Sequence, residues 1–279
     1  MRFCAFLLQF VESFVVGRAD LRRNPQPSMA NLRWTSSKRL KLLAHRCLRA
    51  VGLEIRRTQR AANERIMGSF PPHREHSVIG RAENYFIHDG YRHRAGGIYY
   101  DDTENSDEWQ DEVYKFAREV FDERELKTVC DVGCGSAYKL LKHFRDRSVI
   151  GLDVAETCVW LKRQYPHLTW LELDFKDPPS LQADLTIAAD VIEHSIDPDY
   201  LLSYLATINS EYVILSTPDR NLLRAGTHDG PPRNPAHMRE WSFAEFEAYV
   251  ASRFHVLEHF ISNSAQGTQC LLCTTRSAR

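Results

Sequence analysis

Two glycines follow an apolar run in the segment VCDVGCGSA, residues 129–137. The run is predicted to be a buried strand, and a helical pattern begins directly after it. Gly133 and Gly135 therefore lie in a tight turn at a helix N-terminus, where a ligand can approach the backbone closely. A dinucleotide site would need a third glycine, but residue 138 is Tyr, which argues against NAD. A plain turn between a strand and a helix is the alternative.

Acidic side chains end the next two apolar runs. Asp153 follows the glycines at about the 20-residue distance at which an acid accepts both hydroxyls of an adenosine ribose. Asp174 can accept a hydrogen bond from an adenine amine while the adjacent Phe175 covers the ring. Either acid alone can instead cap a helix N-terminus. Three consecutive strand ends with compatible groups at one sheet edge favour an adenosine-binding site.

Apolar runs alternate with helical patterns from residue 128 onward. The runs predict strands at residues 128–134, 149–154, 168–175, 185–189 and 212–216. This alternation is typical of parallel βαβ units, in which helices cover the sheet. After a predicted helix at 243–252, strands at 254–262 and 268–275 are joined only by a short turn, so they must be antiparallel.

The composition fits one large α/β domain with appendages. The chain has 279 residues, 43% of them apolar and 26% charged, which excludes a wholly disordered, collagen-like or coiled-coil protein. No segment has the roughly 18–20 apolar residues that span a bilayer. The stretch 3–16 is short, contains Glu12 and precedes no cleavage pattern, so we do not expect a secretory signal.

Charge is distributed unevenly along the chain. Residues 1–81 have 16 Lys and Arg against 5 Asp and Glu, whereas residues 82–279 have 20 against 32. Residues 17–37 show no regular period, and residues 1–37 are predicted to be a flexible N-terminus. Residues 38–81 are predicted to contain a basic amphipathic helix, at 38–57, and a linker. That helix either attaches to an anionic membrane surface or packs its apolar stripe on the main domain.

Seven scattered cysteines favour a reducing, cytoplasmic location over a secreted disulfide framework. Cys270 and Cys273 lie three positions apart in a predicted strand, so their side chains point to opposite faces. We therefore expect no metal there, and the sequence predicts no metal site elsewhere. Cys130 and Cys134 are expected to be small core residues.

The ordered motifs over about residues 108–279 resemble class I S-adenosylmethionine-dependent methyltransferases. VCDVGCGSA resembles their glycine-rich motif, GLDV their acidic second-strand motif, and LDF their adenine motif. AADVIEHSIDPDYLL (188–202) and VILSTPDRN (213–221) are similar to the fourth and fifth strands of ubiquinone-biosynthesis-like enzymes. The resemblance implies an α/β, Rossmann-like three-layer sandwich. Its seven-stranded, mostly parallel sheet would have the order 3-2-1-4-5-7-6, with strand 7 antiparallel.

The resemblance also implies S-adenosyl-L-methionine as the cofactor. Gly133 and Gly135 would line its methionine end with support from Asp131, Asp153 would hold the ribose, and Asp174 with Phe175 the adenine. The complete set of implied cofactor contacts is Gln110, Asp131, Gly133, Gly135, Ser136, Asp153, Asp174, Phe175 and Asp190. Ala137 replaces a small glycine of the family motif, which leaves the fine affinity open.

Residues 82–127 are predicted to form a lid segment and a capping helix, at 108–123, on the methyltransferase domain, 128–279. The stretch 99–114 lies where family members carry the helix that closes over the cofactor. It also resembles methyltransferases encoded among bacterial glycan-assembly genes. Trp109 and Gln110 would cap the methionine end, or Trp109 is a core aromatic.

The acceptor side is predicted from loops after the fourth and fifth strands. His194 would act as a general base toward a hydroxyl, or serve as a cap or supporting hydrogen-bond partner. The Gly- and Pro-containing loop 219–240 adds His228, Arg233, His237 and Arg239. We take His194 and His237 as the candidate catalytic residues.

The predicted function is methyl transfer to an oxygen or nitrogen of a small molecule, sugar or glycan intermediate, with the inner membrane surface as one location. A nucleic-acid or protein methyltransferase is the alternative suggested by the basic N-terminal region. Residues 190–193 lack the Asn/Asp-Pro-Pro-aromatic motif of adenine amino methylation, so nucleic acid is not the expected partner. A non-catalytic cofactor-binding scaffold is the third interpretation.

Overall fold

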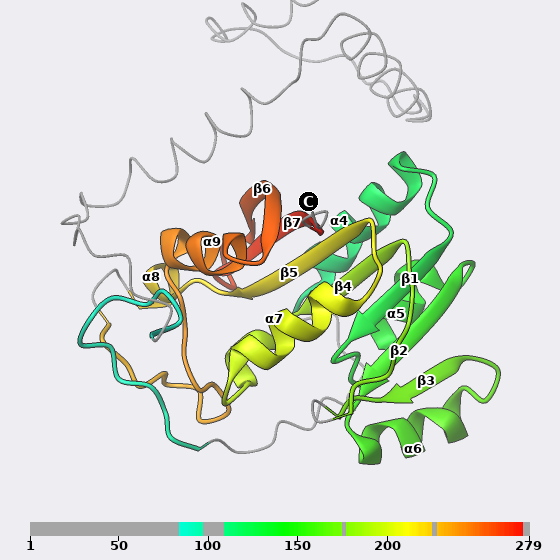
Figure 1. Ribbon diagram of the computed structural model, residues 1–279, viewed down its shortest axis with the longest axis horizontal. Helices are drawn as coiled ribbons and strands as arrows, with labels where there is room; N and C mark the ends of the chain where they lie inside the picture. The colour runs from blue at the N-terminus through cyan, green and yellow to red at the C-terminus, as the bar shows by residue number, and fades with distance from the viewer. Residues whose placement is uncertain (1–83, 97–108, 175–176, 225–227, 276–279) are drawn as a thin grey trace, which may run out of the picture. The chain divides into compact units, whose positions relative to one another are not determined.

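Seven strands form one mixed sheet in the order β3-β2-β1-β4-β5-β7-β6 (Figure 1). The strands are β1 Thr128–Val132, β2 Ser148–Asp153, β3 Thr169–Glu172, β4 Leu185–Ala189, β5 Tyr212–Pro218, β6 Phe254–Asn263 and β7 Thr268–Thr275. β1 to β5 are parallel to one another, and β7 is antiparallel to both β5 and β6. The predicted fold class, strand order and antiparallel terminal pair are confirmed.

The computed structural model describes residues 84–96, 109–174, 177–224 and 228–275. The predicted flexible N-terminus, 1–37, and the basic helix and linker, 38–81, lie outside the described residues. So do Phe175 and most of the stretch 99–114. In the described part of the chain, no helix is both long and apolar enough to cross a bilayer.

Helices cover both faces of the sheet. They are α4 Asp111–Glu123, α5 Tyr138–Phe144, α6 Ala155–Gln164, the 3-10 helix η2 Ile192–His194, α7 Pro198–Thr207, α8 Arg220–Arg224 and α9 Phe243–Ala251. Figure 1 shows α7 and α9 in front of the sheet and α4 and α5 behind it. Two buried clusters match this division: α7 and α9 contribute to one, and α4, α5 and Leu161 of α6 to the other. The central strands are buried on both faces, which explains their continuous apolar runs.

The capping helix α4 shares a core with the sheet. Its apolar residues recur at helical spacing, and Val113, Ala117 and Phe121 are buried against the second cluster. The predicted boundary between residues 127 and 128 therefore separates a helix from a strand that pack in one core. The division of the chain at residues 37 and 81 stays a prediction.

Two strands are shorter than predicted. The first ends at Val132 because Gly133 adopts a left-handed backbone, with φ of 78°, and leaves the extended conformation. The third begins at Thr169 and ends at Glu172, where its neighbour β2 also ends, so no partner strand continues beyond this point. Asp174 consequently follows β3 instead of ending it.

The predicted placement of four cysteines is confirmed. Cys270 belongs to the cluster behind the sheet and Cys273 to the cluster in front, so the two side chains face opposite sides. Cys130 and Cys134 are buried free thiols. Burial raises the pKa of the Cys273 thiol to about 12, so it stays protonated at neutral pH.

Candidate functional site

The turn between β1 and α5 places backbone groups at the carboxyl edge of the sheet. Gly133, Gly135 and Ala137 all have positive φ, and α5 begins at the next residue, Tyr138. A side chain at Gly133 would lie 2.5 Å from a methyl group of Val191. Gly133 is therefore required for close packing against the segment after β4, in addition to any contact with a ligand.

Asp153 closes this turn from the neighbouring strand. Its carboxylate accepts hydrogen bonds from the backbone N–H groups of Gly135 and Val154, both at 2.8 Å. A carboxylate offers about four acceptor positions, so one carboxylate can serve both a turn and a ligand. Asp153 thus organises the glycine turn and presents an acceptor at the same edge, and only the second role was predicted.

Asp131 and Ser136 lie on either side of the glycine turn. Asp131 is fully buried in β1, and its Oδ2 accepts a hydrogen bond of 2.9 Å from the hydroxyl of Tyr114 in α4. The Ser136 hydroxyl is also buried and accepts from the backbone N–H of Tyr138. Sequence reasoning missed Tyr114, which lies in the predicted capping helix but was given no role.

Asp190 follows β4 with a left-handed backbone, at φ of 52°. Such a conformation is uncommon outside glycine and recurs at functional sites. The Ser216 hydroxyl donates to its carboxylate at 2.5 Å. Gln110 donates to the carbonyl of Ala189 at 3.1 Å, so the start of α4 also reaches the end of β4. Burial raises the pKa of Asp190, against the lowering effect of the Ser216 hydrogen bond.

The two candidate catalytic residues, His194 and His237, come together. Their rings contact edge to face with centroids 4.9 Å apart, although one follows β4 and the other lies in the loop before α9. His194 Nδ1 donates to the carbonyl of Ala236 at 3.1 Å. Burial, assisted by His237, lowers the pKa of His194 to about 4, so the ring is neutral at pH 7 and a weak base.

Glu193 is a fully buried acid at the same place and was missed as a site residue. Its Oε2 accepts from the Thr217 hydroxyl of β5 at 2.9 Å. Burial and the nearby Asp190 raise the pKa of Glu193 well above its ordinary value. The signal in the sequence was its position in the motif 188–202, directly before His194.

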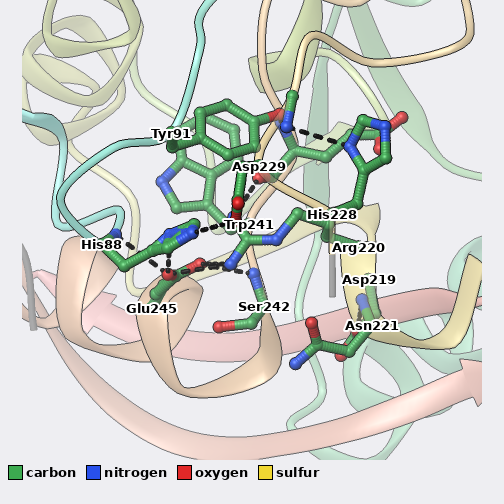
Figure 2. Close-up of polar contacts among 12 residues, drawn as sticks. His88, Tyr91, Asp219, Arg220, Asn221, His228, Asp229, Trp241, Ser242 and Glu245 are labelled. Atoms are coloured by element: carbon green, nitrogen blue, oxygen red, sulfur yellow. Dashed lines mark hydrogen bonds and ion pairs between the residues drawn. The ribbon is translucent and has the colours of Figure 1, made fainter. Parts of the chain in front are cut away.

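Segment 84–96 is tied to the loop 228–242, to α8 and to α9 by polar contacts, which Figure 2 shows. The Arg220 guanidinium pairs with Glu245 at 2.8 Å, and the backbone N–H of His88 donates to the same carboxylate at 3.0 Å. Glu240 donates its backbone N–H to the hydroxyl of Tyr91, whose ring lies under Arg220. These contacts fix the loop that carries His237.

Other predicted loop residues have structural partners. Arg239 donates to the carbonyls of Ser195 and Ile196, which joins the loop to the end of η2. His228 accepts from the backbone N–H of Gly230 at 3.0 Å, and Arg233 is exposed. Trp109 was predicted either to cap the methionine end or to be a core aromatic. It is 48% exposed, so it is not a core residue.

The arrangement suits a ligand that carries hydroxyl and amine groups. β1 lies between β2 and β4, and the three strands run parallel, so the glycine turn, Asp153 and Asp190 share one edge. Ligands of open α/β sheets bind at this edge. Asp174 is exposed beyond β3, and its predicted neighbour Phe175 lies outside the described residues. The donor and acceptor set fits an adenosine with a polar extension.

A family model described as a methyltransferase domain matches residues 102–255, more than half of the chain. No curated protein sequence matches the chain. Among solved structures, an S-adenosylmethionine-dependent methyltransferase from Clostridium acetobutylicum is similar at 13% identity, with a TM-score of 0.48. That match covers 61% of this chain and 93% of the other.

Two further solved structures have similar statistics. The methyltransferase domain of a bacterial Hen1 has 21% identity and a TM-score of 0.46, over 59% of this chain and 98% of its own. Magnesium protoporphyrin IX methyltransferase from Synechocystis, with bound S-adenosylhomocysteine, has 16% identity and a TM-score of 0.46, over 60% of this chain and 83% of its own.

Proposed function

Because the chain belongs to the methyltransferase-domain family, as a class I S-adenosylmethionine-dependent enzyme, we propose that it methylates an oxygen or nitrogen of a small molecule, sugar or glycan intermediate. The observation that carries the proposal is the convergence at one sheet edge. The glycine turn, Asp153 and Asp190 occupy the ends of β1, β2 and β4, and the His194–His237 pair adjoins β4.

The cofactor, when bound, supplies a methyl group already activated by a positively charged sulfur. The chain's own residues bind and orient. The Gly133–Gly135 turn allows close approach to the backbone, Asp153 accepts from ribose hydroxyls, and Asp174 accepts from the adenine amine. Asp131, Ser136, Asp190 and Gln110 surround the methionine end. Little covalent chemistry is required of the protein, so the rate depends on positioning the acceptor for in-line attack.

The acceptor is proposed to lie against His194 and His237. A neutral His194 with a pKa of about 4 accepts a hydrogen bond from a hydroxyl but removes a proton weakly. Its contribution is therefore orientation of the acceptor more than general-base catalysis. The acidic balance of residues 82–279 disfavours a polyanionic acceptor, which supports a small molecule or neutral glycan over nucleic acid.

Titration calorimetry with S-adenosylmethionine and S-adenosylhomocysteine tests cofactor binding. We expect Asp153→Asn to weaken binding by about 1–3 kcal/mol, because a half-buried hydrogen-bonded acceptor loses its charge. Glu211→Gln is the matched control, since Glu211 is an exposed acid before β5, at the opposite edge of the sheet. Absence of heat with both compounds, in a folded sample, would refute the proposal.

The acceptor itself is accessible to an unbiased search. Metabolites and glycans of cells with and without the protein are compared by mass spectrometry for a product heavier by one CH₂ group. A gel shift with RNA or DNA at physiological salt separates the alternative, since a small-molecule enzyme predicts no shift. Failure of every acceptor class to be methylated would favour the non-catalytic scaffold.

We further propose a cytoplasmic location with reversible contact to the inner membrane surface. The basis is the sequence of residues 38–57, which combines an apolar stripe with a basic face. Each basic residue near an anionic leaflet contributes roughly 1 kcal/mol. Co-sedimentation with anionic vesicles at low salt, lost with neutral vesicles, is the expected result. No binding to anionic vesicles would contradict it.

A further inference from the structure

Glu193, His194 and His237 form a cluster with the chemistry of a metal site. Among the described residues, one potential ligand atom from each of these three side chains lies within 4.8 Å of the other two. Two come from η2, after β4, and one from the loop before α9. The backbone N–H of Met238 donates to the Glu193 carbonyl at 2.7 Å, which holds the two segments together.

Glu193 presents a carboxylate oxygen into this cluster. Its side chain is fully buried, and Oε2 is occupied by the Thr217 hydroxyl. Oε1 has no hydrogen-bond partner among the described residues. A buried polar atom without a partner costs about 1–3 kcal/mol, and more for a charged group. A cation at the cluster would satisfy this oxygen.

Both histidines have the tautomer that metal ligation needs. His194 Nδ1 donates to the Ala236 carbonyl, so its lone pair is on Nε2. His237 Nδ1 donates to the Glu240 carboxylate at 3.0 Å, which places its lone pair on Nε2 as well. A carboxylate or carbonyl behind the imidazole is the usual support of a metal-bound histidine.

At His237, the hydrogen bond from Asn234 must be exchanged for ligation. The amide of Asn234 donates to His237 Nε2 at 2.9 Å, in an orientation fixed by the bond from Ala236 N–H to its carbonyl oxygen. When a metal ion displaces the Asn234 amide from His237 Nε2, the amide can donate to water instead, because Asn234 is exposed.

We propose that Glu193, His194 and His237 bind one divalent first-row transition-metal ion. Two imidazoles and a carboxylate suit such ions better than Mg²⁺ or Ca²⁺, which prefer oxygen ligands. Three protein ligands leave coordination positions open, so with the ion bound an acceptor oxygen would bind the ion in place of its hydrogen bond to His194 Nε2. That role rests on the proposed function, whereas binding of the ion does not. Sequence analysis predicted no metal because the ligands meet only in the folded chain.

Cobalt is the probe, because Co²⁺ in a protein site gives visible absorption bands. Tag-free, chelator-treated full-length protein is titrated with Co²⁺, and each sample is also titrated with S-adenosylhomocysteine. We expect the bands to saturate at one Co²⁺ per chain. Glu193→Gln and His194→Asn should abolish them, and Glu240→Gln should weaken binding about 10- to 100-fold. His167→Asn, at an exposed histidine before β3, is the matched control and should bind as the wild type does.

Near-ultraviolet circular dichroism verifies that each variant is folded. Folded wild type that binds S-adenosylhomocysteine but gives no cobalt bands overturns the metal site and leaves the proposed function intact. Bands that persist in both folded variants, Glu193→Gln and His194→Asn, also overturn it. Cobalt binding without any binding of S-adenosylhomocysteine supports the metal site and contradicts the proposed function.

Discussion

The buried pair of Arg220 and Glu245 should be a main source of stability for the wall of the candidate site. Both residues are almost fully buried, at 5% and 7% exposure, and their charged groups are 2.8 Å apart (Figure 2). Glu245 also accepts from the backbone N–H groups of Ser242 and His88. The carboxylate therefore joins α8, the start of α9 and segment 84–96, and the test variant is Glu245→Gln.

The expected cost follows from burial and charge. Unit charges about 4 Å apart attract by about 4 kcal/mol at an effective dielectric constant of 20. Removing one partner leaves the other buried and unpaired, which costs about 3–5 kcal/mol. We expect Glu245→Gln to lower the free energy of unfolding by this amount. Arg220→Met should cost somewhat less, because Glu245 keeps two backbone donors.

A double-mutant cycle by urea unfolding isolates the pair. The double variant should lose less than the sum of the single losses, with a coupling of about 1–3 kcal/mol. Burial alone would raise the pKa of Glu245, but the Arg220 charge and hydrogen bonds hold it below its ordinary value in the folded state. The contribution of the pair is therefore complete above the unfolded pKa and is lost as pH falls through the folded pKa. Arg220→Met should therefore lose less of its free energy of unfolding than the wild type does as pH falls below about 5. Additive single effects, or unchanged acid sensitivity, would refute the reasoning.

Three further outcomes are expected. Gly133→Ala should destabilise the protein by about 1–3 kcal/mol in thermal unfolding, because its methyl group meets Val191 and its φ is positive; an unchanged melting temperature would show that the turn is not tightly packed. Tyr114→Phe should lower the free energy of unfolding by roughly 1–3 kcal/mol, because the hydrogen bond to Asp131 is lost. An unchanged urea midpoint at neutral pH would contradict this. Asp153→Asn should weaken S-adenosylhomocysteine binding more than it destabilises the fold, and equal losses would indicate that the acid only organises the turn.

The fold follows from local sequence pattern to a large extent. Strands buried on both faces are nearly continuous apolar runs, and the helices between parallel strands are amphipathic. The parallel strand 185–189 and the antiparallel strand 268–275 are both predicted to the residue. The short turn after Asn263 forces β6 and β7 to be antiparallel. The end of β3 was mispredicted because strand length depends on the pairing partner, and β2 stops at Asp153.

The residues at the cofactor-binding edge of the sheet were also predictable from the local pattern. Gly133, Gly135 and Asp153 lie at strand ends, and the topology of a parallel sheet brings those ends to one edge whatever the side chains between them are. What local pattern cannot give is the partner of each group. The bond from Gly135 N–H to Asp153 depends on the register between β1 and β2.

Only the tertiary structure decided the acceptor side. His194 and His237 are adjacent because the loop before α9 folds back over η2, and Glu245 contacts His88 from 157 positions away. Neither loop has a period that fixes its path, so its position depends on packing and buried ion pairs that form together. A sequence specifies such contacts only through the energy of the whole fold, which is why the cluster of Glu193, His194 and His237 appears in space and not in the pattern of residues.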